Sequence, residues 1–199
     1  MARTRAEDFE AKRRGLLKSA AAVFAEQGMD KASMSRVARQ AGVSKALLYH
    51  YYPGRDALIL AIIRTHLEGL DAAVAAADDP ALPPGERLRR LVRAVLETYR
   101  GADSEHKVQL NAIPALPEAE RAEITAIERR IVRRLSEVLR AANPGLDRAE
   151  RPLLMPVTMS LFGILNWVFL WFRDDGPVSR EEFADLATTL MLEGIGGLG

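Results

Sequence analysis

The side chains best suited to chemistry lie together in residues 44–50, which read Ser-Lys-Ala-Leu-Leu-Tyr-His. As a short helix, this segment would turn Leu48 inward and leave Lys45, Tyr49 and His50 outside. Cations and hydroxyl groups on an outward helix suit contacts with phosphate oxygens, and the first turn of such a helix suits contacts with base edges. The segment therefore indicates nucleic-acid binding. The alternative is an ordinary helical hairpin whose aromatic side chains pack against neighbours.

Residues for other kinds of chemistry are scarce. The 199 residues include no cysteine, which excludes disulfides, thiolate metal sites and cysteine nucleophiles. The three histidines, His50, His66 and His106, are widely spaced and accompany no metal-ligand or nucleophile pattern. We therefore expect no catalytic residue, metal site or cofactor. The alternative is that the protein is an all-α enzyme. An assay for turnover of candidate thioesters would distinguish an enzyme from a regulator.

Charge is distributed unevenly along the chain. Residues 1–55 contain 11 Lys or Arg and 5 Asp or Glu, whereas the whole chain carries a net charge of only +1. A small basic segment on a mildly acidic body suggests that one end meets a polyanion. Chance scatter of charges on solvated helices is the alternative. The N-terminus leads into a charged stretch, so no signal peptide is expected, and a cytoplasmic location fits the lack of cysteine.

The elements that must position these residues are helices. No sustained apolar/polar alternation indicates a strand, and Gly and Pro punctuate about nine helical segments. The fold class is therefore all-α. The expected helices cover about residues 6–27, 35–41 and 45–51, a long one from 55, one bearing apolar positions over 88–99, then 105–113, 117–143, 153–172 and a last one around 183–191.

Two of these segments form a motif. Gly42 can close the first short helix in the left-handed conformation, Val43 can plug the angle between the helices, and Ser44 is a favourable N-cap for the second. Two short helices joined by a turn of three or four residues with a glycine are typical of a helix-turn-helix. The outward side chains of residues 45–50 then belong to its recognition helix.

Residues 16–60, whose body is AAAVFAEQGMDKASMSRVARQAGVSKALLYHYYPGRDAL, resemble the TetR-type regulators. The resemblance implies an all-α homodimer with a helix-turn-helix DNA-binding domain over residues 1–52 and a ligand-binding and dimerisation domain over residues 53–199. It also implies that Arg55 replaces the usual phosphate-binding lysine, keeping the charge and adding bidentate geometry. Leu47 departs from the small Thr or Ser of the family, so it can contact a thymine methyl but cannot hydrogen-bond. The DNA-binding residues implied are Ser33, Ser35, Ser44, Lys45, Ala46, Leu47, Tyr49, His50 and Arg55.

Residues 160–187 resemble one subgroup of that family, in which the phenylacetate-degradation repressors called PaaR are the nearest in pattern. The effectors of the subgroup tend to be acyl-CoA thioesters, so this resemblance implies a repressor released by such a ligand, for example phenylacetyl-CoA. A regulator of another catabolic or efflux pathway with a non-CoA hydrophobic ligand is the alternative. The candidate ligand-binding residues are Tyr99, His106, Leu110, Asn111, Met155, Met159, Phe162 and Asn166.

The residues themselves leave these ligand assignments open. Met155 and Met159 have the spacing to line an adaptable apolar slot, although plain core packing is the more common role for such residues. A buried Asn166 would face the ligand, the dimer axis or a neighbouring backbone group. The arginines within residues 129–134 would meet CoA phosphates or form a solvated helix face.

The last two helices are the expected dimer interface, because they carry more aromatic surface than one hairpin can bury. The residues assigned to it are Trp167, Trp171, Phe172, Phe183 and Leu190. Residues 153–172 also form a stretch of 20 residues without a charge, long enough to span a bilayer. A membrane-anchored regulator is therefore a further alternative, which fractionation without detergent would test, although Pro, Gly and polar residues dilute the hydrophobicity of the stretch.

Overall fold

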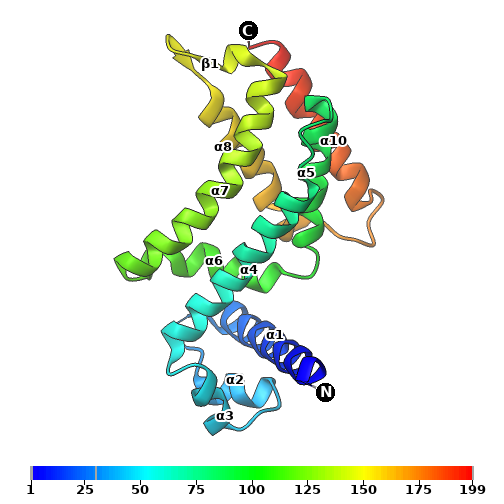
Figure 1. Cartoon of the computed structure of the whole chain (residues 1–199). Helices are drawn as coiled ribbons and strands as arrows, with labels where there is room; N and C mark the ends of the chain where they lie inside the picture. The colour runs from blue at the N-terminus through cyan, green and yellow to red at the C-terminus, as the bar shows by residue number, and fades with distance from the viewer. Residues whose placement is uncertain (1, 30, 199) are drawn as a thin grey trace. The chain divides into compact units, whose positions relative to one another are not determined.

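The computed structural model describes residues 2–29 and 31–198, and helices dominate this part of the chain (Figure 1). It contains nine α-helices of seven residues or more, which confirms the all-α expectation. Their bounds lie close to the predicted ones. They are α1 Ala2–Gln27, α2 Met34–Gln40, α3 Lys45–Tyr51, α4 Arg55–Ala77, α5 Pro84–Thr98, α6 Asp103–Ala112, α7 Glu118–Ala142, α8 Leu154–Asn166 and α10 Arg180–Gly196.

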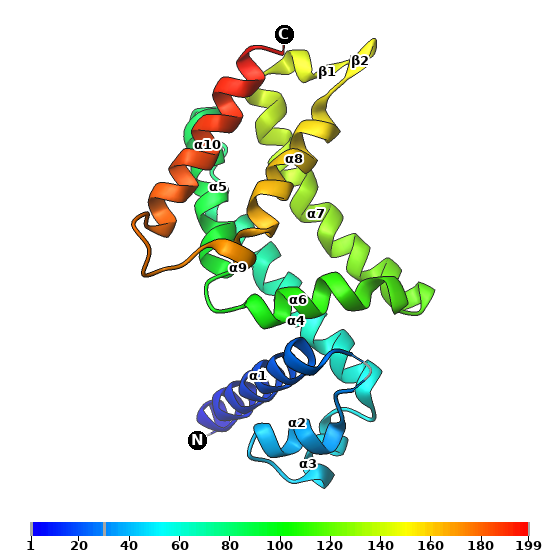
Figure 2. The same cartoon turned by 180° about the vertical axis from the view of Figure 1, so that it is seen from behind.

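Three short features depart from the sequence prediction. The expected single helix over residues 153–172 is interrupted at Trp167, so that α8 is followed by a separate single turn, α9 (Val168–Trp171) (Figure 2). Two-residue strands β1 (Asp147–Arg148) and β2 (Arg151–Pro152) pair antiparallel, where no strand was expected. Two residues are too few for an alternating pattern to be recognised. The third departure is a pair of short 3₁₀ helices, η1 Ile113–Ala115 and η2 Pro144–Leu146, which the sequence analysis did not predict.

The chain packs as two compact units. The first comprises Met1–Leu67 and Gly101–Thr125, and the second comprises Glu68–Arg100 and Ala126–Gly199. This division describes packing, and the functional boundary between residues 52 and 53 remains a prediction.

In the first unit, α1 packs against α6 and α2, and α2 packs against α3. Its core contains the fully buried side chains of Phe24, Leu48, Leu58 and Ile62. Burial of such side chains contributes about 1.5–3 kcal/mol each relative to exposure, so the core fixes the positions of the short helices.

In the second unit, α5 packs against α10 and α8. The apolar stripe on α5 has helical spacing, and Leu88, Leu91, Val95 and Leu96 are all buried. A capping box begins α10: the Ser179 hydroxyl oxygen accepts a hydrogen bond from the Glu182 amide (3.2 Å), and the Glu182 carboxylate accepts one from the Ser179 amide (2.7 Å). The expected last helix is therefore confirmed, together with the physical reason for its start.

The segment of α8 and α9, Leu154–Trp171, has a mean hydropathy of 1.6 and is long and apolar enough to cross a membrane by length and composition alone. One third of the segment is buried inside the structure. The core helix of a soluble protein meets the same criteria, so this feature does not by itself indicate a membrane protein.

Candidate functional site

The turn between α2 and α3 is built by local hydrogen bonds. Gly42 adopts φ +65°, a conformation that costs other residues steric strain. Its amide donates to the carbonyl of Arg39 (3.2 Å), and the amide of Val43 donates to the carbonyl of Ala38 (3.0 Å). These two bonds form a Schellman motif, which satisfies the last carbonyls of α2 and directs the chain into α3.

Serines cap both short helices. The Ser33 hydroxyl oxygen accepts a hydrogen bond from the Arg36 amide (3.3 Å), and the Ser44 hydroxyl oxygen accepts one from the Leu47 amide (3.1 Å). Both serines are exposed, as is Ser35. Each capping hydroxyl still has its proton to donate, so capping and donation to a phosphate are compatible.

The α3 helix has one buried and one outward face. Leu48 is fully buried, whereas Leu47 and Tyr49 are 41% and 42% exposed. Exposed apolar and aromatic side chains that lie near one another on a surface suit contact with a partner. The outward face consists of Lys45, Ala46, Leu47, Tyr49 and His50, all exposed.

Ring contacts stabilise this outward face. The Lys45 ammonium lies 5.7 Å from the centre of the Tyr49 ring, within the range of a cation–π contact. The His50 ring meets the edge of the Tyr51 ring at 5.8 Å, and Tyr51 also contacts Phe9 of α1 at 5.4 Å. These contacts restrict the side chains of a helix that is only seven residues long.

Arg55 begins α4 and has partners for part of its guanidinium group. Its Nη1 donates to the Met29 carbonyl (3.0 Å), and its Nε lies 3.5 Å from the Asp56 carboxylate. The side chain is 42% exposed. A guanidinium has five N–H donors, so several remain for a phosphate.

Two of the predicted effector residues meet in the second unit. The Tyr99 hydroxyl donates a hydrogen bond to Oδ1 of Asn166 (2.8 Å). Phe162 is buried on the same helix as Asn166, whereas Met155 and Met159 are 54% and 50% exposed. The apolar character of α8 therefore divides between a core and an outward face, a division that the sequence pattern did not predict.

The other three predicted effector residues belong to α6 in the first unit. His106 is buried and lies against His66, with ring centres 5.9 Å apart. Leu110 is 42% exposed, and the Asn111 side chain donates to the Lys107 carbonyl (2.8 Å). Asn111 also lines a cavity of about 420 Å³ together with Arg55.

Met155 lies in a groove with arginines of α7. This groove has a volume of about 320 Å³, and Arg129, Arg133, Arg140 and Met155 are among the residues that line it. The sequence analysis named Met155 and the arginines of residues 129–134 separately, and it missed Arg140. The spacing of Arg133 and Arg140, seven residues apart on a helix, is the signal that places them on one face.

Family models match most of the chain. Residues 16–62 match the model described as "Bacterial regulatory proteins, tetR family", and residues 81–195 match "Tetracyclin repressor-like, C-terminal domain". The chain belongs to the tetR family. It is therefore a regulator of transcription with an N-terminal helix-turn-helix that binds DNA and a helical C-terminal domain.

Individual tetR-family proteins agree with this assignment. The regulator BetI of Rhizobium meliloti is 33% identical over 145 residues, which are 70% of each chain. The crystal structure of PfmR from Thermus thermophilus superposes with a TM-score of 0.77 at 30% identity, covering 89% of this chain and 97% of that one. The structure of AibR in complex with isovaleryl coenzyme A and operator DNA has a TM-score of 0.75 at 28% identity, covering 90% and 97%.

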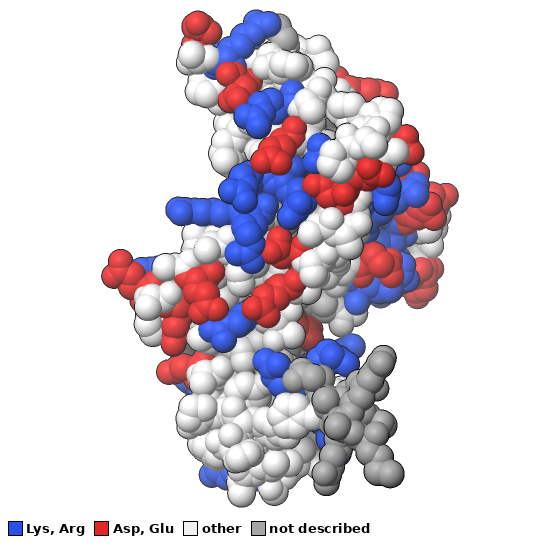
Figure 3. Space-filling view, in the orientation of Figure 1, with Lys and Arg blue, Asp and Glu red and all other residues white. Residues whose placement is uncertain are grey.

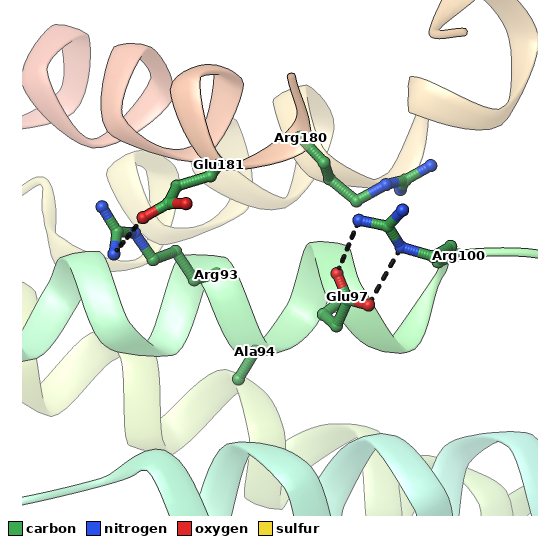
Figure 4. A pocket seen from close by; sticks show the side chains of 6 residues that line it. All are labelled: Arg93, Ala94, Glu97, Arg100, Arg180 and Glu181. Carbon is green, nitrogen blue, oxygen red and sulfur yellow. Dashed lines mark hydrogen bonds and ion pairs between the residues drawn. The ribbon is translucent and has the colours of Figure 1, made fainter. Parts of the chain in front are cut away.

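A third hollow in this tetR-family chain lies between α5 and the start of α10 and has a volume of about 360 Å³ (Figure 4). Its arginines are paired: Arg93 with Glu181 (2.8 Å), and Arg100 with Glu97 (2.9 Å). Arg180, only 10% exposed, pairs with a carboxylate of the preceding loop and donates to the Leu96 carbonyl (2.9 Å). The charges of this hollow are thus compensated within the fold.

The five predicted interface residues differ in exposure. Trp167, Trp171 and Leu190 are 53%, 57% and 58% exposed, whereas Phe172 is half-buried and Phe183 is buried. The Trp171 ring contacts the Phe183 ring edge-on at 5.2 Å. Phe183 therefore packs within the single chain, in contact with the exposed tryptophan. Two further exposed apolar residues, Leu170 and Leu186, were not predicted.

Proposed function

We propose that this tetR-family protein is a cytoplasmic, dimeric repressor that binds a palindromic operator and is released by a small-molecule effector. The observation that carries the DNA part is the outward face of α3, where Lys45, Leu47 and Tyr49 are exposed on a capped helix. In a dimer, two such helices enter successive major grooves about 34–36 Å apart. Ser33, Ser35 and Arg55 then hold phosphates beside the recognition helix, which contacts bases through its first turn.

The dimer is proposed to form through exposed apolar side chains of α8, α9 and α10. These elements and the residue that joins α8 to α9 carry Met159, Trp167, Leu170, Trp171, Leu186 and Leu190, all at least half exposed. Helices α8 and α10 pack against each other, and we propose that their outward residues contribute to one surface. Exposed apolar surface of this kind is typical of an interface with another chain.

The effector is proposed to be an acyl-CoA thioester, with phenylacetyl-CoA as the first candidate. The AibR structure, 28% identical over 90% of this chain, contains isovaleryl coenzyme A, which supports the class of ligand. A thioester needs an apolar slot, a polar group near its carbonyl and cations for its phosphates. Tyr99 and Asn166 offer polar groups, and Phe162 beside them on α8 is apolar. The arginines near Met155 offer the cations.

Release follows from a shift between two populations of the protein. An effector that binds the form unable to fit the operator more tightly than the operator-binding form shifts the protein away from DNA. The size of the effect equals the difference in affinity between the two forms, and operator DNA weakens effector binding by the same factor.

The test begins with an operator selected from random duplexes by the wild-type protein. Phenylacetyl-CoA at micromolar concentration is expected to release the protein, as measured by fluorescence anisotropy, whereas phenylacetate or CoA alone is not. The thioester should also raise the unfolding temperature, because a ligand of the folded state adds RT ln(1 + [L]/Kd).

The outcomes separate the parts of the proposal. If medium-chain acyl-CoAs also release the protein, the effector is not specifically phenylacetyl-CoA, but the proposal of an acyl-CoA thioester stands. Calorimetry without binding of any acyl-CoA would contradict the effector proposal and favour a non-CoA hydrophobic ligand, while DNA binding would stand. Failure to select any duplex would contradict the role of α3.

A further inference from the structure

The arginines of α7 fall into two groups that differ in their partners. Arg130 forms an ion pair with Asp71 (2.8 Å), and Arg134 forms one with Asp78 (3.3 Å). Arg129 directly precedes Arg130, and Arg133 directly precedes Arg134. Neither Arg129 nor Arg133 has an ion pair within the part of the chain that the structure describes. Basic side chains gather over the middle of α7 in Figure 3, interleaved with acidic ones. The ion pairs therefore neutralise one face of the helix and leave the other positive.

The positive face lines the groove between α7 and the start of α8. Arg129, Arg133 and Arg140 contribute three positive charges to its lining, and Glu137 contributes one negative charge. Arg140 lies 3.4 Å from the Asp147 carboxylate, and both side chains are about half exposed, so the pairing is weak. The groove consequently carries uncompensated positive charge, unlike the hollow shown in Figure 4, in which each arginine is paired.

The other wall of the groove is apolar and fixed. Leu154 and Met155, the first residues of α8, line it. Below them, the Ser136 hydroxyl hydrogen-bonds to the Thr158 hydroxyl (2.8 Å), and this buried bond ties α7 to α8. The groove therefore has two different walls, one cationic and one apolar, held together by a buried polar contact.

The spacing of the arginines indicates the length of a ligand. Along a helix with a rise of 1.5 Å per residue, Arg129 and Arg140 are about 16 Å apart, and Arg133 lies between them. A single phosphate or carboxylate is too small to reach more than one or two of these side chains. An extended molecule with several phosphates and an apolar part matches both walls.

We propose that this groove binds the phosphate-bearing end of an organic ligand, with Arg129 and Arg133 as its principal contacts and Arg140 as a third. If the effector is the acyl-CoA of the proposed function, on which this identification of the ligand rests, the groove holds the diphosphate and 3′-phosphate of CoA. Met155 then contacts the neutral part of the molecule between the phosphates and the acyl group.

The test compares two substitutions on the same helix. Arg129→Gln/Arg133→Gln removes the unpaired arginines, and Arg130→Gln/Arg134→Gln removes the same charge from the paired face. Binding of CoA, 3′,5′-ADP and phenylacetyl-CoA is measured by calorimetry on the full chain at two salt concentrations, with unfolding temperature as the check of folding. Hydrogen bonds to charged groups predict a loss of at least about tenfold in affinity for the first variant. The matched variant should change affinity by less than about threefold, and the first variant should lose most of the salt dependence.

The results distinguish this inference from the proposed function. Binding of 3′,5′-ADP or CoA that is lost in the Arg129/Arg133 variant supports the groove, even if no acyl-CoA releases the operator. Equal binding of phenylacetyl-CoA by the wild-type protein and that variant overturns the groove and leaves the acyl-CoA effector in place. If the wild-type protein binds none of the three compounds, both the groove proposal and the acyl-CoA effector proposal are overturned.

Discussion

The hydroxyl group of Tyr99 and the side-chain oxygen of Asn166 are joined by a hydrogen bond of 2.8 Å, although 67 positions separate them in the sequence. The bond ties the end of α5 to the last residue of α8. Burial raises the pKa of Tyr99, so the hydroxyl keeps its proton and remains the donor. This bond to a side chain of the same chain is not one of the three roles considered for Asn166, and a role toward the effector or the dimer axis remains a proposal.

Loss of this bond should have a measurable effect on stability. Tyr99→Phe is expected to lower the free energy of unfolding by about 1 kcal/mol, because Asn166 loses its donor. In the presence of Asn166→Ala, the same change should have a smaller effect, and urea unfolding of the four proteins measures the coupling. Tyr49→Phe, on an exposed ring, is the control and should change stability by less than about 0.5 kcal/mol. Equal effects of Tyr99→Phe in both backgrounds would show that the bond contributes nothing.

Substitutions in α3 test the DNA-binding face. Lys45→Ala should weaken operator binding and reduce the slope of log affinity against log salt by about 1, because one phosphate contact is lost. Tyr49→Ala should also weaken binding, with the dimer and the unfolding temperature unchanged. Arg121→Ala, which removes a charge from an exposed position of α7, is the control. Gel shifts with unchanged affinity for both α3 variants would contradict the role of this helix.

A charge on the exposed face of α10 should prevent dimerisation. Leu190 is 58% exposed in the single chain, so Leu190→Glu disturbs no core packing but places a carboxylate in the proposed interface, at a cost of several kcal/mol. Trp171→Glu should have the same effect, but it also removes the ring contact with Phe183 and is less specific. Light scattering should detect monomers or aggregates and gel shifts a loss of operator binding. Ala122→Glu, at an exposed position elsewhere, is the control and should dimerise and bind the operator like the wild type. If Leu190→Glu still forms a dimer, the interface lies on other residues.

His66 should make the stability depend on pH. Burial, with a smaller contribution from His106, lowers its pKa from 6.5 to about 4 in the folded state. Between these values the unfolded chain binds more protons than the folded one, so stability is complete above about pH 6.5 and falls as the pH decreases to about 4. The linked loss is about 3 kcal/mol across this window.

Urea unfolding at pH 7, 6, 5 and 4 measures this dependence. His66→Gln should have a flatter profile than the wild type, whatever its absolute stability. His50→Gln, on the exposed face of α3, should keep the wild-type slope. A parallel decline in the His66 variant would assign the acid sensitivity to carboxylates instead.

The DNA-binding motif could be predicted from the amino-acid sequence, because the interactions that form it are local. The caps of Ser33 and Ser44 and the left-handed turn at Gly42 join residues no more than five positions apart. Such contacts depend only on the identities of neighbouring residues, and a periodic pattern of apolar residues completes each helix. The number and approximate bounds of the longer helices followed for the same reason.

The division of apolar and charged residues between the core and the surface of the second unit depends on its tertiary packing. The sequence does not distinguish the exposed Leu190 from the buried Phe183, because both occupy apolar positions of one helix. Likewise, Arg130 and Arg133 are the same residue type on the same helix. They differ because Arg130 forms an ion pair with Asp71, which is distant in the sequence, whereas Arg133 does not. Partners that lie 59 positions apart meet through the packing of whole helices, and that packing depends on contacts summed over the entire core.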